Sequence, residues 1–146
     1  MTVLEAIQRS SEFLAKKGVE SPRLNAELLL AQVLGIPRMR LYLGFERCLG
    51  DTEVDALRAF VMRRSRREPL QHILGQTSFC GLEFKVSRDV LVPRPETELL
   101  AERAWEFLGG CGGEPSVLDY GTGSGCLAVT LAVRVASARI TAVDVS

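Results

Sequence analysis

The chain has 146 residues, 47% of them hydrophobic, which is enough for a packed core in one ordinary domain or two small ones, so intrinsic disorder is not expected. Eighteen Lys and Arg residues balance 18 Asp and Glu residues; residues 1–75 carry 12 basic and 9 acidic residues, and residues 76–146 carry 6 and 9. This imbalance is too mild to indicate a nucleic-acid-binding protein, and no direct contact with nucleic acid is expected.

The four cysteines form no CxxC pair and have no zinc-ligand spacing with the single histidine, His72, so no metal site is predicted. Reduced thiols are typical of cytoplasmic proteins, and we expect that location. The N-terminal stretch MTVLEAIQRSSEFLAKKG is amphipathic, and charges interrupt it before the apolar run of a signal peptide can form. No apolar run approaches the roughly 20 residues that cross a bilayer, so no membrane association is expected.

Residues 1–75 are predicted to form a small helical bundle with three long helices and two short ones, near 38–43 and 69–74. Capping residues, proline and glycine mark the ends of the long helices: Thr2, Glu5 and Gly18 for the first, Ser21, Pro22 and Gly35 for the second, and Asp51 at the start of the third. The apolar stripe of the second helix is expected to be formed by Leu24, Leu28, Leu29 and Val33.

From residue 76 onward the pattern changes. TSFCGLEFKVS alternates polar and apolar residues around Gly81, which predicts a β-hairpin in a linker over residues 76–92. A helix begins at Pro95 and ends at Gly109-Gly110, and Trp105 and Phe107 are expected in its core face. A strand at 116–119, a helix from about Ser124 to Val135 and a strand at 139–143 then form a βαβ unit. Since two parallel strands cannot bury both faces of a sheet, we expect the chain to be part of a longer protein.

Three glycines follow the first of these strands, in the sequence Gly121-Thr122-Gly123-Ser124-Gly125. A glycine-rich turn between a strand and a helix lets a ligand reach the main chain, and the helix start offers free N–H groups. Asp144 lies 19 residues after Gly125, at the end of the next strand, where an acidic side chain binds ribose hydroxyls. The spacing predicts a nucleotide-type site; a glycine-rich connection without a ligand is the alternative.

The loop departs from the dinucleotide fingerprint G-x-G-x-x-G, because Cys126 stands at the position of the third glycine. Asp119, two residues before Gly121, would repel a pyrophosphate but suits a cationic ligand. S-adenosylmethionine has a sulfonium, an ammonium and a ribose and no phosphate, so it is the predicted cofactor. An NAD-dependent oxidoreductase would use the same βαβ unit and is the alternative enzyme.

The segments LDYGTGSGCLAVTLA and AVDVS resemble motifs I and II of class I methyltransferases. EPLQHILG, FCGLEFKV and LVPRPETELL are similar to the segments that precede these motifs in the HemK/PrmC family, the release-factor glutamine N5-methyltransferases. The resemblance spans essentially the whole chain. It implies an α/β fold: an N-terminal helical bundle that recognises the substrate (1–75), the hairpin linker (76–92), and the start of a Rossmann-like methyltransferase domain (93–146).

The resemblance also implies an activity and a site. The enzyme would transfer a methyl group from S-adenosylmethionine to the glutamine amide of the release factor's Gly-Gly-Gln motif, with the release factor bound in part by the N-terminal domain. The expected cofactor-binding residues are Asp119, Gly121, Thr122, Gly123, Ser124, Gly125, Asp144 and Arg94, with Leu91 next to Arg94. Between two prolines, Arg94 is aimed at an acceptor; helix capping or an ion pair with Glu98 is the alternative.

In this family an Asn-Pro-Pro-Tyr segment holds the substrate amide. The only asparagine of the chain is Asn25, in a predicted helix, so no catalytic residue is assigned and the 146 residues alone are expected to be inactive. A non-enzymatic, partner-binding chain is therefore a further alternative. The run MRRSRREPL is interpreted either as a solvated helix end or as a surface that binds an acidic partner or ribosomal RNA.

Overall fold

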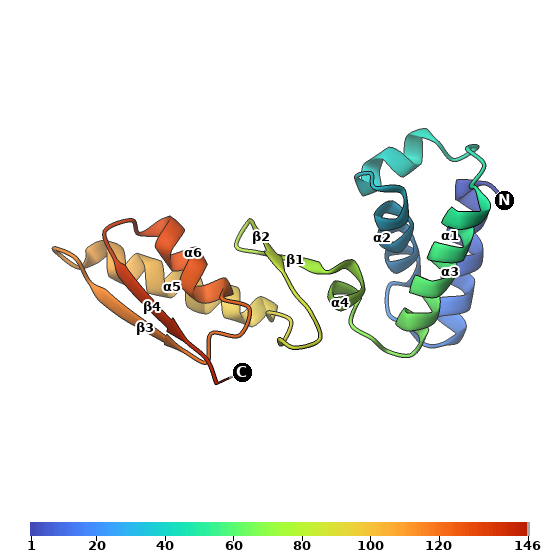
Figure 1. The fold of residues 1–146 in the computed structure, drawn as a ribbon. Coiled ribbons are helices and arrows are strands. Elements are labelled where there is room, and N and C mark those ends of the chain that lie inside the picture. The colour runs from blue at the N-terminus through green and yellow to red at the C-terminus, as the bar shows by residue number, and fades with distance from the viewer. Residues whose placement is uncertain (146) are drawn as a thin grey trace. The chain divides into compact units, whose positions relative to one another are not determined.

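The computed structural model describes residues 1–145, which divide into two compact units, Met1–Leu74 and the part from Gly75 onward (Figure 1). The first unit contains α1 (Val3–Lys16), α2 (Pro22–Leu34), the 3-10 helix η1 (Arg38–Leu43), α3 (Asp51–Ser65) and α4 (Leu70–Leu74). The second contains the strands β1 (Gln76–Phe79) and β2 (Leu82–Lys85), then α5 (Pro95–Gly110), β3 (Ser116–Tyr120), α6 (Cys126–Arg134) and β4 (Arg139–Val143). The predicted α/β class and order of elements are confirmed.

The helix ends of the first unit follow local rules with two corrections. Thr2 and Glu5 form the predicted capping box, with Glu5 N–H donating to Thr2 Oγ1 over 3.2 Å. Ser21 precedes α2 as predicted, but its side chain caps nothing, because its backbone is left-handed (φ 47°). Asp51 is the first residue of α3 and not its cap; Gly50 precedes it, and Glu53 Oε2 accepts from the Gly50 N–H over 2.9 Å.

The core of the first unit is formed by apolar side chains of α1, α2 and α3 and of the segments after them. The predicted stripe of α2 is partly wrong: Leu29 is buried, but Leu24 is 42% exposed, and Ala26 and Leu30 take its place in the core. Apolar residues occur on more than one side of this helix, so periodicity alone does not identify the buried face. Its buried face also carries two polar residues, Asn25 and Glu27.

Glu27 is a buried carboxylate, with only 3% of its side chain exposed. It accepts hydrogen bonds from Arg23 Nε over 3.1 Å, from Arg38 Nη1 over 2.9 Å and from the Tyr42 hydroxyl over 2.9 Å. Burial by itself raises the pKa of Glu27, but the three donors outweigh burial and hold this pKa below its ordinary value of 4.5. The ionised carboxylate therefore ties α2 to η1.

The arginine run at the end of α3 has a structural role. Arg63 pairs with Glu68 through two nitrogens, at 3.0 and 2.6 Å. Arg64 Nε donates to Asn25 Oδ1 over 2.7 Å, and Arg67 donates to the carbonyl oxygens of Gly18 and Lys17 at the end of α1. Arg64 and Arg67 thus join the end of α3 to the start of α2 and the end of α1, whereas Arg63 pairs with Glu68 just after α3. The run is therefore more than a solvated helix end.

The second unit starts with the predicted hairpin, in which Gln76 pairs with Lys85 and Phe79 with Leu82. Cys80 and Gly81 both have positive φ (50° and 79°), as a two-residue type I′ turn requires. Behind the hairpin, Phe79 and Phe84 pack with Ala101, Cys126 and the ring of Trp105. Trp105 is thus in the core as predicted, whereas Phe107 is 72% exposed, contrary to expectation.

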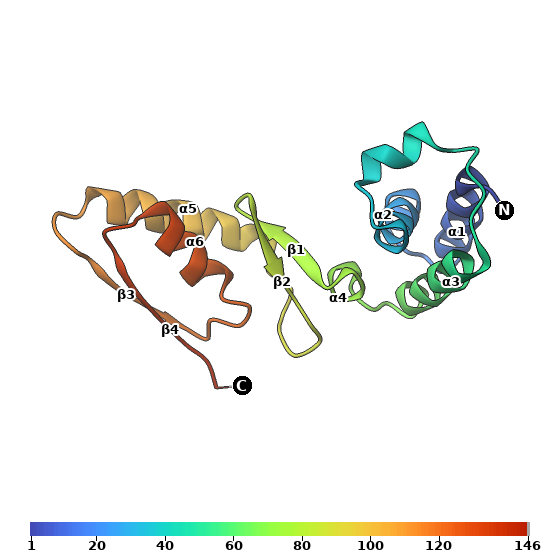
Figure 2. The ribbon, with the colours of Figure 1, turned by 45° about the horizontal axis from the view of Figure 1, so that its top comes forward.

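β3 and β4 are parallel, in register from Ser116 opposite Arg139 to Tyr120 opposite Val143. Both helices α5 and α6 lie on one face of this sheet, as Figure 2 shows, and Val117 and Ile140 pack against them. On the other face, Leu118 is 62% and Tyr120 80% exposed. The crossover from β3 through α6 to β4 brings the ends of both strands to the same edge, where the glycine loop begins.

Candidate cofactor-binding site

The loop between β3 and α6 has a conformation that only glycine adopts freely. Gly121, Gly123 and Gly125 have φ of 79°, 55° and 74°, in the left-handed region. The N–H groups of Gly121 and Thr122 both donate to the carbonyl oxygen of Val143, over 2.8 and 3.0 Å, so the loop folds back over the end of β4. The three glycines predicted from the sequence are therefore required by the backbone.

The protein itself does not crowd these glycines. A Cβ placed on Gly121 or Gly123 meets no atom within 4 Å, and a Cβ on Gly125 meets only Val129, at 3.9 Å. The backbone edge at Gly121 and Gly123 is thus open, and a flat ligand can contact it directly.

Asp144 is held against the loop. Its Oδ2 accepts from the Gly123 N–H over 2.7 Å, and its Oδ1 accepts from the Val145 N–H over 2.8 Å. These two bonds, one to each carboxylate oxygen, hold the side chain in one orientation at the end of β4. The predicted acidic residue is therefore at the loop, and its orientation is fixed by the loop's own backbone.

Asp119 is held by a second contact within the loop, because the Thr122 hydroxyl donates to Asp119 Oδ2 over 2.8 Å. The side chain is half-buried at the end of β3. A fixed carboxylate at this position presents negative charge to the space above the loop, which favours a cationic group and disfavours a phosphate.

The predicted residues meet around two small cavities. One, of about 200 Å³, is lined on one side by the segment from Leu91 to Arg94 and on the other by Asp119 and the loop from Gly121 to Ser124. The second, of about 100 Å³, lies between Gly121 and Asp144. Ligand pockets usually measure about 300–1,000 Å³, so both cavities together approach the lower limit. Gly125 lines neither cavity and instead begins α6.

Arg94 is the residue immediately before α5, and it lines the larger cavity. Neither alternative for Arg94 is observed within residues 1–145: its side chain does not cap α5, and it forms no ion pair with Glu98, whose Oε1 accepts from the Cys80 N–H over 3.0 Å. Its guanidinium is exposed and can bind an anionic group of a ligand.

Sequence reasoning missed part of the lining. Val92, Pro93, Thr97, Cys126 and Leu127 also line the larger cavity. Sequence signals could have identified two of these five residues, Thr97 and Cys126. Thr97 belongs to the same PRPETE stretch as Arg94, and Cys126 holds the position of the third glycine of the dinucleotide fingerprint.

Other kinds of site find no support in the described part of the chain. Residues 1–145 contain no cluster of His, Cys, Asp and Glu side chains that could hold a metal ion. The four cysteines, all within that range, are free thiols. None of the described helices combines the length and the apolar character that crossing a membrane requires.

Comparison with known proteins identifies the relatives of the chain. Residues 5–75 match the PrmC N-terminal domain family. Over 99% of its length the chain is 48% identical to the release factor glutamine methyltransferase of Chlorobaculum tepidum and 43% identical to that of Geobacter sulfurreducens, covering 51% and 50% of those proteins. The chain thus spans about half the length of the curated relatives it matches. By these matches residues 5–75 belong to the PrmC N-terminal domain family, and the chain as a whole is similar to release factor glutamine methyltransferases.

Proposed function

We propose that the whole protein transfers a methyl group from S-adenosylmethionine to the side-chain amide of the glutamine in the Gly-Gly-Gln motif of a peptide chain release factor. The observation that carries this proposal is the cavity in which Asp119, Arg94 and the open glycine loop meet. The relatives 43–48% identical to the chain are release factor glutamine methyltransferases, which supports the same activity. The proposed location is the cytoplasm, where translation terminates.

The residues at the loop fit this cofactor. Gly121 and Gly123 would allow the adenosyl group to lie against bare backbone, with Thr122 and Ser124 beside them. Asp144, held against the loop at the end of β4, would accept hydrogen bonds from the ribose hydroxyls. Asp119 would face the cationic end and Arg94 the carboxylate of the methionyl group.

When bound, S-adenosylmethionine supplies a methyl group activated by attachment to a sulfonium. An amide nitrogen is a poor nucleophile, so the enzyme must orient the amide and exclude water from it. In the family an Asn-Pro-Pro-Tyr segment does this, and the 146 residues contain no such segment. We therefore assign cofactor binding to residues 91–144, recognition of the release factor to residues 1–75, and no catalytic residue to the chain.

Two alternatives are less well supported. An NAD-dependent oxidoreductase would need a pyrophosphate beside Asp119 and a glycine where Cys126 stands, and the relatives named above are methyltransferases. A purely partner-binding role would not explain why the backbone is left open at Gly121 and Gly123.

Calorimetric titration of the whole protein tests the cofactor. We expect S-adenosylmethionine or its demethylated product to bind and NAD not to bind; the opposite result would refute the proposal. Asp144→Ala should weaken cofactor binding by about 1.5–3 kcal/mol, or about 10–150-fold, the range for hydrogen bonds to a charged group. Asp55→Ala, at an exposed carboxylate of α3, serves as the control and should leave the affinity unchanged.

A methylation assay tests the reaction. With a release factor and labelled cofactor, the whole protein should modify the glutamine of the Gly-Gly-Gln motif, and the 146-residue chain should not. Methylation by the purified 146-residue chain would show that the groups that hold the amide lie within it.

A further inference from the structure

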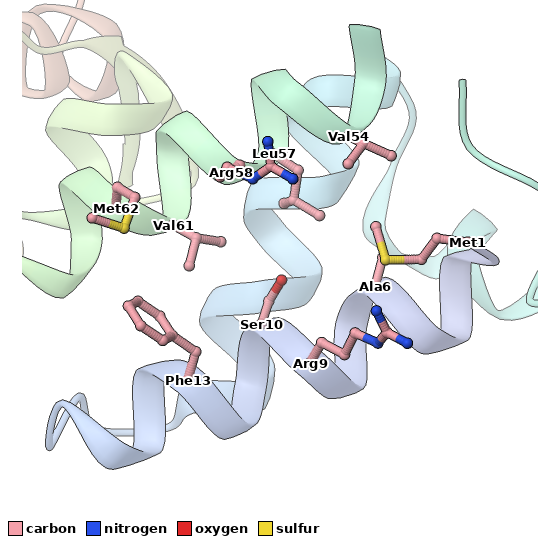
Figure 3. Close-up of a pocket in the computed structure, with 10 residues that line it drawn as sticks. All are labelled: Met1, Ala6, Arg9, Ser10, Phe13, Val54, Leu57, Arg58, Val61 and Met62. Atoms are coloured by element: carbon pink, nitrogen blue, oxygen red, sulfur yellow. The ribbon is translucent and has the colours of Figure 1, made fainter. Parts of the chain in front are cut away.

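A groove of about 390 Å³ lies between α1 and α3 in the first unit, as Figure 3 shows. The side chains that line it follow helical spacing on both walls: Ala6, Arg9, Ser10 and Phe13 from α1, and Val54, Leu57, Arg58, Val61 and Met62 from α3, with Met1 at one end. Each helix thus presents a row of residues at i, i+3, i+4 and i+7 to the same space.

The groove is apolar at its floor and along its walls. Ala6, Leu57 and Val61 are buried and belong to the core of the first unit. Above them Phe13 is half-buried and Met62 is 41% exposed. Methionine is flexible and polarizable, so it adapts to partners of different shape. Covering this apolar surface with an apolar side chain of a partner therefore lowers the free energy of the complex.

Two arginines add positive charge to the groove, one from each helix (Figure 3). Arg9 makes no ion pair within residues 1–145. Arg58 pairs with Asp55 over 2.9 Å, but both side chains are 71% exposed, and such pairs contribute only about 0–1 kcal/mol. Both guanidinium groups are thus available to carboxylates of a partner, which they can bind through two nitrogens.

We propose that this groove binds an amphipathic helix of a protein partner that carries carboxylates beside its apolar stripe. A third helix fits between two helices when its apolar ridge enters the space between their side-chain rows. A second copy of the same groove is disfavoured, because it would bring arginine against arginine. The proposal does not depend on cofactor binding, since all of these residues lie in Met1–Leu74 and the candidate cofactor site lies in the second unit.

The test uses the 146-residue chain with ¹³C-labelled methionine methyl groups. The probe is a helical peptide of about 18 residues with leucines at i, i+3, i+4 and i+7 and glutamates beside them, long enough to form a helix. Its matched control has lysine at each glutamate position. Of the three methionines, Met1 and Met62 line the groove, whereas Met39 is on η1 and 66% exposed, so Met39 is an internal control.

We expect the glutamate peptide to shift the Met62 resonance and to leave Met39 unchanged, with the lysine peptide binding about tenfold more weakly or worse. The double variant Arg9→Glu, Arg58→Glu should reverse this preference; both side chains are exposed, and far-UV circular dichroism checks that the variant folds. Equal binding of the two peptides, no binding, or an equal shift of Met39 would each overturn the proposal. So would a Met62 shift that depends on protein concentration without peptide, which would identify a second copy as the occupant.

Discussion

The glycine loop is tested most sharply by comparing Gly121→Ala with Gly113→Ala. The two glycines have almost the same φ, 79° and 78°, and a Cβ on either meets no atom within 4 Å. Gly121 lines both cavities of the candidate site, whereas Gly113 lies in the connection between α5 and β3. The pair thus has equal backbone strain and differs in its position relative to the site.

An alanine in the left-handed region costs roughly 1–2 kcal/mol, because its Cβ approaches the following carbonyl oxygen. Since neither position is crowded, both variants should lose about this much stability, which corresponds to about a 5–30-fold change in the folding equilibrium. Only Gly121→Ala also adds a methyl group to the open edge that faces the cavity. We therefore expect it to weaken cofactor binding by more than about tenfold, or 1.4 kcal/mol, and Gly113→Ala to leave the affinity unchanged.

Urea denaturation measures the stability of the two variants, and calorimetric titration of S-adenosylhomocysteine measures the affinity, both in the whole protein. Gly109→Ala, in α5 with no positive φ and open space around its Cβ, is the unstrained control and should stabilise by about 0.5–1 kcal/mol. Cofactor affinity that falls equally in Gly121→Ala and Gly113→Ala would refute the assignment of the loop to cofactor binding. Wild-type affinity in Gly121→Ala would refute it as well.

Three further predictions concern the two units. Glu27→Ala should lower the free energy of unfolding of the first unit by about 2–4 kcal/mol, because it removes a buried ion-pair partner. Asp55→Ala, at an exposed carboxylate, should change this free energy by less than about 0.5 kcal/mol. Similar urea midpoints for the two variants would contradict this prediction. The contribution of Glu27 should be complete above its ordinary pKa of 4.5 and be lost as the pH falls toward its lowered folded-state pKa, and Glu27→Gln should flatten this part of the stability curve. Amide hydrogen exchange in the 146-residue chain should be slow in the helices of residues 1–74 and fast from Val117 to Val143, and uniform protection in a monomer would show that the two-strand sheet is stable alone.

The features that the sequence predicted correctly are those encoded by neighbouring residues. The capping box at Thr2, the hairpin turn before Gly81 and the bounds of β4 each depend on a few adjacent positions. Pro95 at the start of α5 is of the same kind. Such signals remain valid whatever the rest of the chain does, because capping and turn geometry involve only local hydrogen bonds and φ angles.

The features that the sequence did not predict depend on residues far apart in the chain. Arg64 bonds to Asn25, 39 positions earlier, and Arg67 bonds to Gly18, 49 positions earlier. Nothing in the run MRRSRREPL distinguishes an arginine that meets a helix end from one in water, since the partners are backbone and amide oxygens with no charge signature. The buried Glu27 is similar, because its three donors come from two different helices.

The shape of the candidate site and its volume have different origins. The shape is set within residues 119–144: Thr122 bonds to Asp119, Gly123 to Asp144, and Gly121 to the end of β4. These bonds within the loop and the adjacent strand ends orient both carboxylates. The volume is different, because the cavities of about 200 and 100 Å³ are small for a ligand with an adenosyl and a methionyl group. Under the proposed function, recognition of the cofactor's charge and ribose would therefore be a local property of this loop, whereas enclosure of the cofactor would need further walls around these two cavities.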